Sequence, residues 1–118
     1  MELSYPLWSD APQPRLLASR HRDTREIVFP ALPGSSPLAA RHDTVELDGA
    51  GEVYSFTVIH PGRKSGEAPY ALGYVDLPGP VRIFGRLTGT PRPAIGERYV
   101  ARPDAQFGYV FAAEAAQA

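Results

Sequence analysis

The chain has 118 residues, a net charge of −1 and 21% charged residues. Acidic residues lie among its eleven arginines and single lysine, so it lacks the basic excess that is typical of a nucleic-acid-binding surface. Because cysteine is absent, disulfides, a thiolate nucleophile, iron–sulfur ligation and a cysteine-based zinc site are all excluded.

The apolar segments and the first residues predict a soluble, cytoplasmic protein. The N-terminal sequence MELSYPLWSD has neither a basic stretch nor an apolar core, so we expect no secretory signal. No apolar run approaches the roughly 20 residues that a membrane helix requires. We therefore expect no membrane as a partner.

Residues 1–43 predict an extended, mostly irregular N-terminal arm. Six prolines in this region exclude a long helix, because proline lacks the backbone donor that a helix interior needs. The stretch PALPGSSP is typical of a loop, and a brief strand is expected over Glu26–Phe29. We expect the arm to pack on the rest of the chain through apolar anchors, namely Trp8, Leu16, Leu17, Val28, Phe29 and Leu32.

From Thr44 onward the pattern changes to short strands. β-branched and aromatic residues gather in segments that Gly and Pro separate. Within Glu52–His60, simple alternation places Tyr54 and Phe56 on one face, and Pro78-Gly79 suits the centre of a type II turn. The expected strands are 44–47, 52–60, 70–77, 81–87, 98–102 and 107–112.

These segments predict an all-β fold with a small antiparallel barrel over residues 44–112 and a flexible tail over 113–118. The long first strand and the tight second hairpin favour a five-stranded OB-fold barrel. Gly73 and Gly85 lie inside strands, where glycine permits a bulge or a tight bend at a barrel corner. An immunoglobulin-like sandwich needs about seven strands, for which the chain barely has room.

Several of these strands, in order, resemble a known family. The chain has GEVYSFTVIHP from Gly51, PYALGYVDLPGPVRIFGRLTG from Pro69 and IGERYV from Ile95. These runs resemble the OB-fold domain of the acyl-CoA-associated zinc-ribbon/OB-fold proteins, the domain of unknown function numbered thirty-five. The matching positions are Gly51, Val53, Tyr54, Ser55, Phe56, Thr57, Pro69, Tyr70, Gly85, Leu87, Gly89 and Gly96.

The resemblance also implies a rubredoxin-like zinc ribbon in the arm, with two Cys-x-x-Cys knuckles around a Phe-Pro step. Phe29-Pro30 matches that step. Zinc needs about four nitrogen, sulfur or carboxylate ligands, so we expect a degenerate, metal-free ribbon and no zinc. Counted from the Phe-Pro step, the knuckle positions fall near His21, Thr24, Ser36 and Ala39, none of them cysteine.

What the resemblance implies about function is a non-catalytic accessory subunit of a heteromeric complex. Its partner would be a thiolase-like, ketoacyl synthase-like or acyltransferase subunit that handles acyl-CoA or related thioesters. We expect this chain to bind no cofactor by itself, and coenzyme A shared with the partner is the one cofactor left open.

The residues themselves offer no catalytic set. The acidic residues around the first turn, from Asp43 to Glu52, fit no calcium-loop pattern, and a solvated turn is the simpler interpretation. We therefore expect no catalytic residue and no metal site in this chain. The three histidines share no metal-ligand or catalytic spacing, and they are His21, His42 and His60.

Two groups of residues are candidates for binding. Arg63 and Lys64 lie side by side in the loop PGRKSGEA, and such loops border the ligand face of OB barrels. They are candidates to contact coenzyme A phosphates or an acidic patch of a partner; an exposed loop with neither role is the alternative. Aromatic residues are enriched at interface cores, so the strand aromatics are candidates for a partner interface: Tyr54, Phe56, Tyr70, Tyr74 and Phe84.

Two other functions remain as alternatives. The strand aromatics could form a base-stacking platform of a single-stranded nucleic-acid-binding protein. The balanced charge disfavours it, because such platforms work beside a positive groove. A stand-alone enzyme is the third interpretation, and it would depend on His60.

Overall fold

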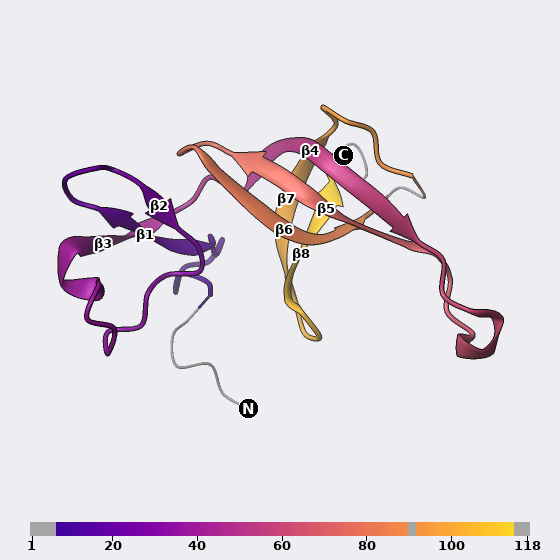
Figure 1. Ribbon diagram of the computed structural model, residues 1–118, viewed down its shortest axis with the longest axis horizontal. Coiled ribbons are helices and arrows are strands. Elements are labelled where there is room, and N and C mark those ends of the chain that lie inside the picture. The colour runs from indigo at the N-terminus through magenta and orange to yellow at the C-terminus, as the bar shows by residue number, and fades with distance from the viewer. Residues whose placement is uncertain (1–6, 90–91, 115–118) are drawn as a thin grey trace.

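Two β-structures follow one another along the chain in the computed structural model, a three-stranded sheet and a closed five-stranded barrel (Figure 1). The structure describes residues 7–89 and 92–114. The first sheet is antiparallel, in the order β2-β1-β3. Its strands are β1 (Leu17–His21), β2 (Ile27–Val28) and β3 (His42–Glu46), and the short 3-10 helix η1 (Ala39–Arg41) precedes β3.

The barrel confirms the all-β class and the five-stranded OB-type closure predicted from the sequence. Its strand order is β4-β5-β6-β8-β7, and β7 pairs back with β4. The barrel is mixed rather than antiparallel throughout as predicted, because β6 and β8 pair in parallel at Leu87 and Thr88 while the other neighbours are antiparallel. The strands are β4 (Ala50–Ile59), β5 (Tyr70–Leu77), β6 (Val81–Thr88), β7 (Arg98–Asp104) and β8 (Gly108–Ala113).

The N-terminal arm is more regular than the expected irregular segment. The prolines exclude helix but not strands, and none of those in the described part of the arm lies within β1, β2 or β3. Leu16 and Ala18 are fully buried, and Ser19 is buried with its Oγ accepting a 2.8 Å hydrogen bond from the backbone N–H of Leu32. These contacts order the described part of the arm.

The strand expected at the start of the barrel belongs to the first sheet instead. β3 pairs with β1 from Leu17↔Glu46 to His21↔His42, so the barrel strands begin at Ala50 rather than at Thr44. At the other end, β8 includes Ala113, which is fully buried and not part of a tail. The rest of the tail that we expect to be flexible, residues 115–118, lies outside the described residues.

The barrel core is filled by the inward-facing residues of the strands. Tyr99 of β7 and Phe111 of β8 are the largest fully buried side chains. Burying such a side chain contributes about 1.5–3 kcal/mol. The other core residues from the barrel strands are Val53, Ala71, Val75, Leu77, Ile83, Leu87, Ala101 and Ala113.

A β-bulge in β4 reverses the expected alternation of its side chains. Val53 pairs with Val75 and Ser55 with Tyr74, so Tyr54 is an extra residue on β4. After the bulge, Phe56 and Val58 pack against the core, whereas Tyr54 is exposed. The prediction that Tyr54 and Phe56 share a face is therefore wrong, because simple alternation takes no account of an inserted residue.

The first sheet packs against one end of the barrel. The Trp8 indole Nε1–H donates a 2.8 Å hydrogen bond to the Gly108 carbonyl, and the Phe29 ring lies 5.5 Å from that of Tyr109. Ile27 packs on the core, whereas the expected anchor Val28 is exposed. In Figure 1 the β5–β6 turn points toward this sheet.

That turn differs from the predicted type II turn. Leu77 pairs with Val81, so three residues form the loop, and a cis peptide bond precedes Pro80. Gly79 is not among the described glycines with positive φ, which a type II turn would require at this position.

Candidate functional site

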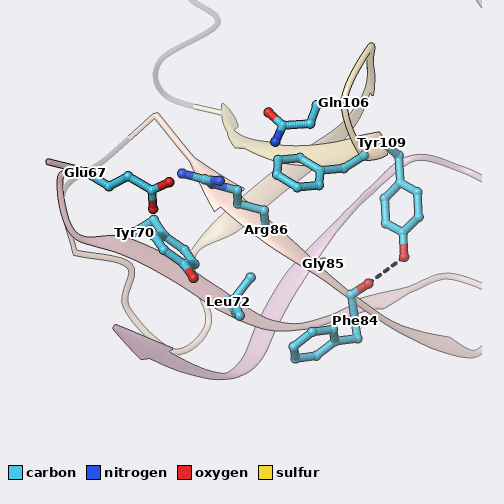
Figure 2. A pocket seen from close by; sticks show the side chains of 9 residues that line it. Glu67, Tyr70, Leu72, Phe84, Gly85, Arg86, Gln106 and Tyr109 are labelled. Carbon is cyan, nitrogen blue, oxygen red and sulfur yellow. Dashed lines mark hydrogen bonds between the residues drawn. The ribbon is translucent and has the colours of Figure 1, made fainter. Parts of the chain in front are cut away.

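A pocket of about 460 Å³ lies on the outer face of β5 and β6, and we call it the β5–β6 pocket. This volume falls within the range of ligand sites, about 300–1,000 Å³. Figure 2 shows side chains converging on it from these strands and from two loops. It is lined by Glu67, Tyr70, Leu72, Phe84, Gly85, Arg86, Gln106, Phe107 and Tyr109.

The pocket occupies the position that OB folds use for ligands. That position is the face of the second and third strands, bordered by the loop between strands one and two and the loop between strands four and five. Here β5 and β6 are the second and third barrel strands. Glu67 comes from the β4–β5 loop, and Gln106 and Phe107 come from the β7–β8 turn.

Strand register places the pocket residues on one face. Leu72 lies opposite Arg86 and Tyr74 opposite Phe84, so the outward residues of β5 and β6 form adjacent pairs. Tyr74 and Phe84 contact edge to face, with ring centroids 5.1 Å apart.

The β7–β8 turn holds Phe107 beside the pocket. The Asp104 carboxylate accepts hydrogen bonds from the backbone N–H groups of Gln106 and Phe107, at 2.9 and 2.8 Å. Gly108 follows with φ of 85°, a left-handed conformation that favours glycine. These contacts fix the backbone of the turn that carries Phe107.

Arg86 is the cation of the pocket. Its Cζ lies 4.4 Å from the ring centroid of Tyr70 and 5.4 Å from that of Phe107, both within cation–π range. No carboxylate of the described residues forms an ion pair with it.

Tyr109 lines the pocket beside Phe84. Its hydroxyl donates a 2.6 Å hydrogen bond to the Phe84 carbonyl, drawn as a dashed line in Figure 2. This bond joins β6 to β8 outside the short stretch in which their backbones pair. Burial disfavours the phenolate and raises the pKa of Tyr109 above its usual value.

Beside the pocket, Tyr54 and Arg82 form a second cluster. The Arg82 Cζ lies 3.4 Å from the Tyr54 ring centroid. Its Nε and Nη2 donate to the two carboxylate oxygens of Asp76 at 2.6 and 3.2 Å. The hydrogen bond to Asp76 raises the pKa of Arg82 above its usual value.

Exposed aromatic side chains connect the cluster with the pocket. Tyr54 is 51% exposed, Tyr74 42%, Phe84 47% and Phe107 48%. We call these four residues, together with half-buried Tyr70, the outer aromatic face. Exposed aromatic side chains that gather on one face of a domain are typical of interaction sites.

The structure separates the predicted binding residues. Tyr54, Tyr70, Tyr74 and Phe84 lie on the outer aromatic face, whereas Phe56 points inward because of the bulge, with Arg92 5.8 Å from its ring. The predicted interface role of all five remains a prediction.

Arg63 and Lys64 lie apart from the pocket. They belong to the 3-10 helix η2 (Arg63–Ser65) in the exposed β4–β5 loop, which Figure 1 shows extending away from the barrel. Glu67 of the same loop lines the pocket, but these two cations do not. Their predicted contact with coenzyme A phosphates remains a prediction.

The pocket residues that sequence reasoning did not assign to a site are Glu67, Leu72, Arg86, Gln106, Phe107 and Tyr109. Arg86 could have been found, because it lies two residues after Phe84 and alternation places both on one face. Phe107 was assigned to the start of a strand, but it lies in a turn.

Two of the histidines make local contacts in the first sheet. The His21 and His42 rings meet edge to face at 5.0 Å. His21 Nδ1 accepts hydrogen bonds from the backbone N–H groups of Asp23 and Thr24, and His42 Nδ1 bonds with the Leu38 carbonyl. Within residues 7–89 and 92–114, no group of three or more His, Cys, Asp or Glu side chains could hold a metal ion.

Comparison with known families identifies the barrel. The family model described as "ChsH2, C-terminal OB-fold domain" matches residues 44–102, half of the chain. The chain belongs to this OB-fold family. The resemblance to the acyl-CoA-associated zinc-ribbon/OB-fold proteins is thereby confirmed. None of the helices in the described part of the chain is long and apolar enough to cross a membrane.

Individual relatives extend the comparison. The benzoylsuccinyl-CoA thiolase subunit BbsA of Thauera aromatica is 34% identical over 84 residues, which cover 70% of this chain and 58% of the relative. The subunit of the same name from Geobacter metallireducens is 31% identical over 80 residues, covering 68% and 55%. The matched region thus spans little more than half the length of these relatives. A solved chain titled Ltp2-ChsH2(DUF35) aldolase superposes with a TM-score of 0.62 at 28% identity, covering 84% of both chains.

Proposed function

We propose that this chain is a non-catalytic accessory subunit that binds a thiolase-like or acyltransferase enzyme and supports chemistry on acyl-CoA thioesters in the cytoplasm. The observation that carries the proposal is its similarity to two proteins named as subunits of benzoylsuccinyl-CoA thiolase. The solved structure that resembles it is named an Ltp2-ChsH2(DUF35) aldolase. The partner subunit supplies the reactive groups.

Two features of the structure support this role. The outer aromatic face exposes Tyr54, Tyr74, Phe84 and Phe107, the kind of side chains that are enriched in interface cores. In addition, the Nδ1 atoms of His21 and His42 already have backbone partners. These bonds give both histidines a role in the local structure of the first sheet.

A contribution to coenzyme A binding belongs to the same proposal. Arg63 and Lys64 are exposed cations on a loop that borders the OB ligand face, and they have no carboxylate partner in the described residues. In the assembled complex they contact the phosphates of a coenzyme A that the partner binds.

Co-purification tests the proposed role. A tagged copy expressed in the native cell should be recovered in a stoichiometric complex with a thiolase-fold subunit, which mass spectrometry would identify. Recovery of the chain only as a lone monomer would contradict the proposal. An equally tagged, unrelated OB-fold protein serves as the control for non-specific capture.

A single-stranded nucleic-acid-binding role is the second candidate. The exposed aromatic rings on the OB ligand face favour it, because bases stack on such rings. The carboxylates of Glu67 and Asp76 on the same face oppose it. Fluorescence anisotropy with a labelled oligonucleotide at low salt should stay flat if the accessory role is correct. Tight binding that weakens steeply with added salt would favour this second candidate.

A further inference from the structure

The β5–β6 pocket contains a cation without an ionic partner in the described part of the chain. Arg86 is half-buried between the rings of Tyr70 and Phe107, at 4.4 and 5.4 Å. Aromatic faces attract the charge, but a guanidinium also has five N–H donors in its plane. Arg86 forms no ion pair with the described residues, so its in-plane donors can serve an acceptor from outside.

Arg82 provides an internal comparison. It lies on the same outward face of β6, four residues before Arg86, and it also stacks on a tyrosine ring. Unlike Arg86, it has its own carboxylate, with Asp76 bound at 2.6 and 3.2 Å. On this face, Arg82 therefore has a carboxylate partner, whereas Arg86 has none among the described residues.

The pocket itself does not supply the missing group. Glu67 lines it, but its carboxylate forms no ion pair with Arg86. The volume of about 460 Å³ is larger than a single carboxylate needs, and aromatic side chains form much of the wall. A fitting occupant is therefore a carboxylate carried on an apolar body.

The surroundings favour a protein segment over a small molecule. Phe84 and Phe107, which line the pocket, are about half exposed, and Tyr74 and Tyr54 of the outer aromatic face are exposed outside it. A small ligand in the pocket would leave this surface uncovered. Arginine flanked by aromatic residues is also the composition of interface hot spots. The carboxylates of Asp76 and Glu67 oppose a ligand with a charge on every nucleotide more strongly than a segment with a single acidic side chain.

We infer that the β5–β6 pocket receives an acidic side chain, flanked by an apolar or aromatic residue, from an exposed segment of the partner subunit. Arg86 binds the carboxylate through paired N–H groups, as guanidinium does in bidentate ion pairs. The rings of Tyr70 and Phe107 hold the guanidinium in place and contact the apolar neighbour. The inference rests on the proposed function, because it names the contact by which the accessory subunit holds its partner.

A peptide titration of the isolated full chain tests this inference without the partner. The probes are acetyl-Phe-Glu-Phe-amide and its counterpart with Gln in place of Glu, followed by amide chemical shifts of the isotope-labelled protein. We expect the acidic peptide to bind at least about tenfold more tightly, the lower end for charge-assisted hydrogen bonds. The shifts should gather at Tyr70, Arg86 and Phe107.

Three variants make the test specific. Arg86→Gln should abolish the preference for the acidic peptide, whereas Arg82→Gln should keep it, because Asp76 already occupies that arginine. Glu67→Gln removes the nearby competing carboxylate and should tighten acidic-peptide binding several-fold. Equal affinity for both peptides in the unmodified chain, or an unchanged preference in Arg86→Gln, would overturn the inference.

Nucleic acid gives a distinct outcome. If a short oligothymidine shifts the same amides at lower concentration than the acidic peptide, the pocket serves nucleic acid and the inference is overturned. Because the titration contains no partner subunit, its failure would overturn the pocket inference but not the proposed accessory role. A failed co-purification would likewise contradict the accessory role but not the peptide binding at the pocket.

Discussion

Replacing Gly73 with alanine should strongly destabilise the barrel. Gly73 lies opposite Phe56, next to the bulge in β4. A Cβ added there would overlap the carbonyl oxygen of Ser55 and lie 2.9 Å from the Phe56 Cα. Both are backbone atoms of a paired strand, so they can move only by distorting the β4–β5 ladder.

The expected loss follows from the cost of overpacking a well-filled core. Such substitutions typically cost about 1–3 kcal/mol, and a clash with backbone places Gly73→Ala near about 3 kcal/mol. For a domain of this size that corresponds to a fall in melting temperature of roughly 10 °C.

Gly62→Ala is the matched control. Gly62 has an extended conformation with φ of −63° and ψ of 158°, and an added Cβ meets no atom within 4 Å. Alanine there should be neutral or stabilise by about 0.4–1 kcal/mol, because it restricts the unfolded chain.

Urea denaturation followed by tryptophan fluorescence measures both variants. Trp8 is the single tryptophan and bonds to the Gly108 carbonyl of the barrel, so its emission reports on the packed state. Free energies of unfolding for Gly73→Ala and Gly62→Ala that agree within about 0.5 kcal/mol would refute the assigned close approach of β4 and β5.

Three further predictions concern the arm, the pocket wall and the β4–β5 loop. Ser19→Ala removes a buried acceptor and leaves a backbone N–H unpaired, so unfolding in urea should show a loss of about 1–3 kcal/mol; no loss would contradict the ordered arm. Because burial raises the pKa of Tyr109 above 10.0, the folded state favours the neutral phenol, and its stabilisation is present below pH 10 and lost as pH rises through the raised value. The free energy of unfolding of the unmodified chain should therefore fall more steeply above pH 10 than that of Tyr109→Phe, and parallel curves would contradict this. The double variant Arg63→Gln/Lys64→Gln should weaken coenzyme A binding by the co-purified complex in calorimetry, and an unchanged affinity would remove these residues from the proposal.

Much of the barrel could be predicted from local sequence. The predicted strand at Tyr70–Leu77 has the observed bounds, and the next strand is one residue longer than expected. Glycine and proline mark the ends of these segments, and the β-branched and aromatic residues between them fit a half-buried strand.

The remaining errors come from contacts between distant residues. Nothing local in the run around Tyr54 signals an inserted residue, because a bulge is defined by the register with β5. Likewise, Thr44 pairs with Ser19 of the arm rather than with a barrel strand, and only the tertiary pairing decides between the two.

Only part of the candidate site could be predicted, because some of its residues meet through contacts between distant segments. Alternation along β5 and β6 places Tyr70, Tyr74 and Phe84 on one face, and it includes Arg86 once the whole strand is followed. Phe107 reaches the pocket through the closure of the barrel, where the β7–β8 turn meets the β5–β6 face. That meeting depends on strand order, which local patterns do not encode.

Reconstituted turnover tests the division of labour between the two subunits most directly. The separately purified chain and its thiolase-fold partner would be assayed for cleavage of an acyl-CoA thioester, each alone and then mixed. The account predicts no turnover by this chain alone, and turnover by the partner that rises when the chain is added. Thioester cleavage by the isolated chain, lost in His60→Ala, would contradict it.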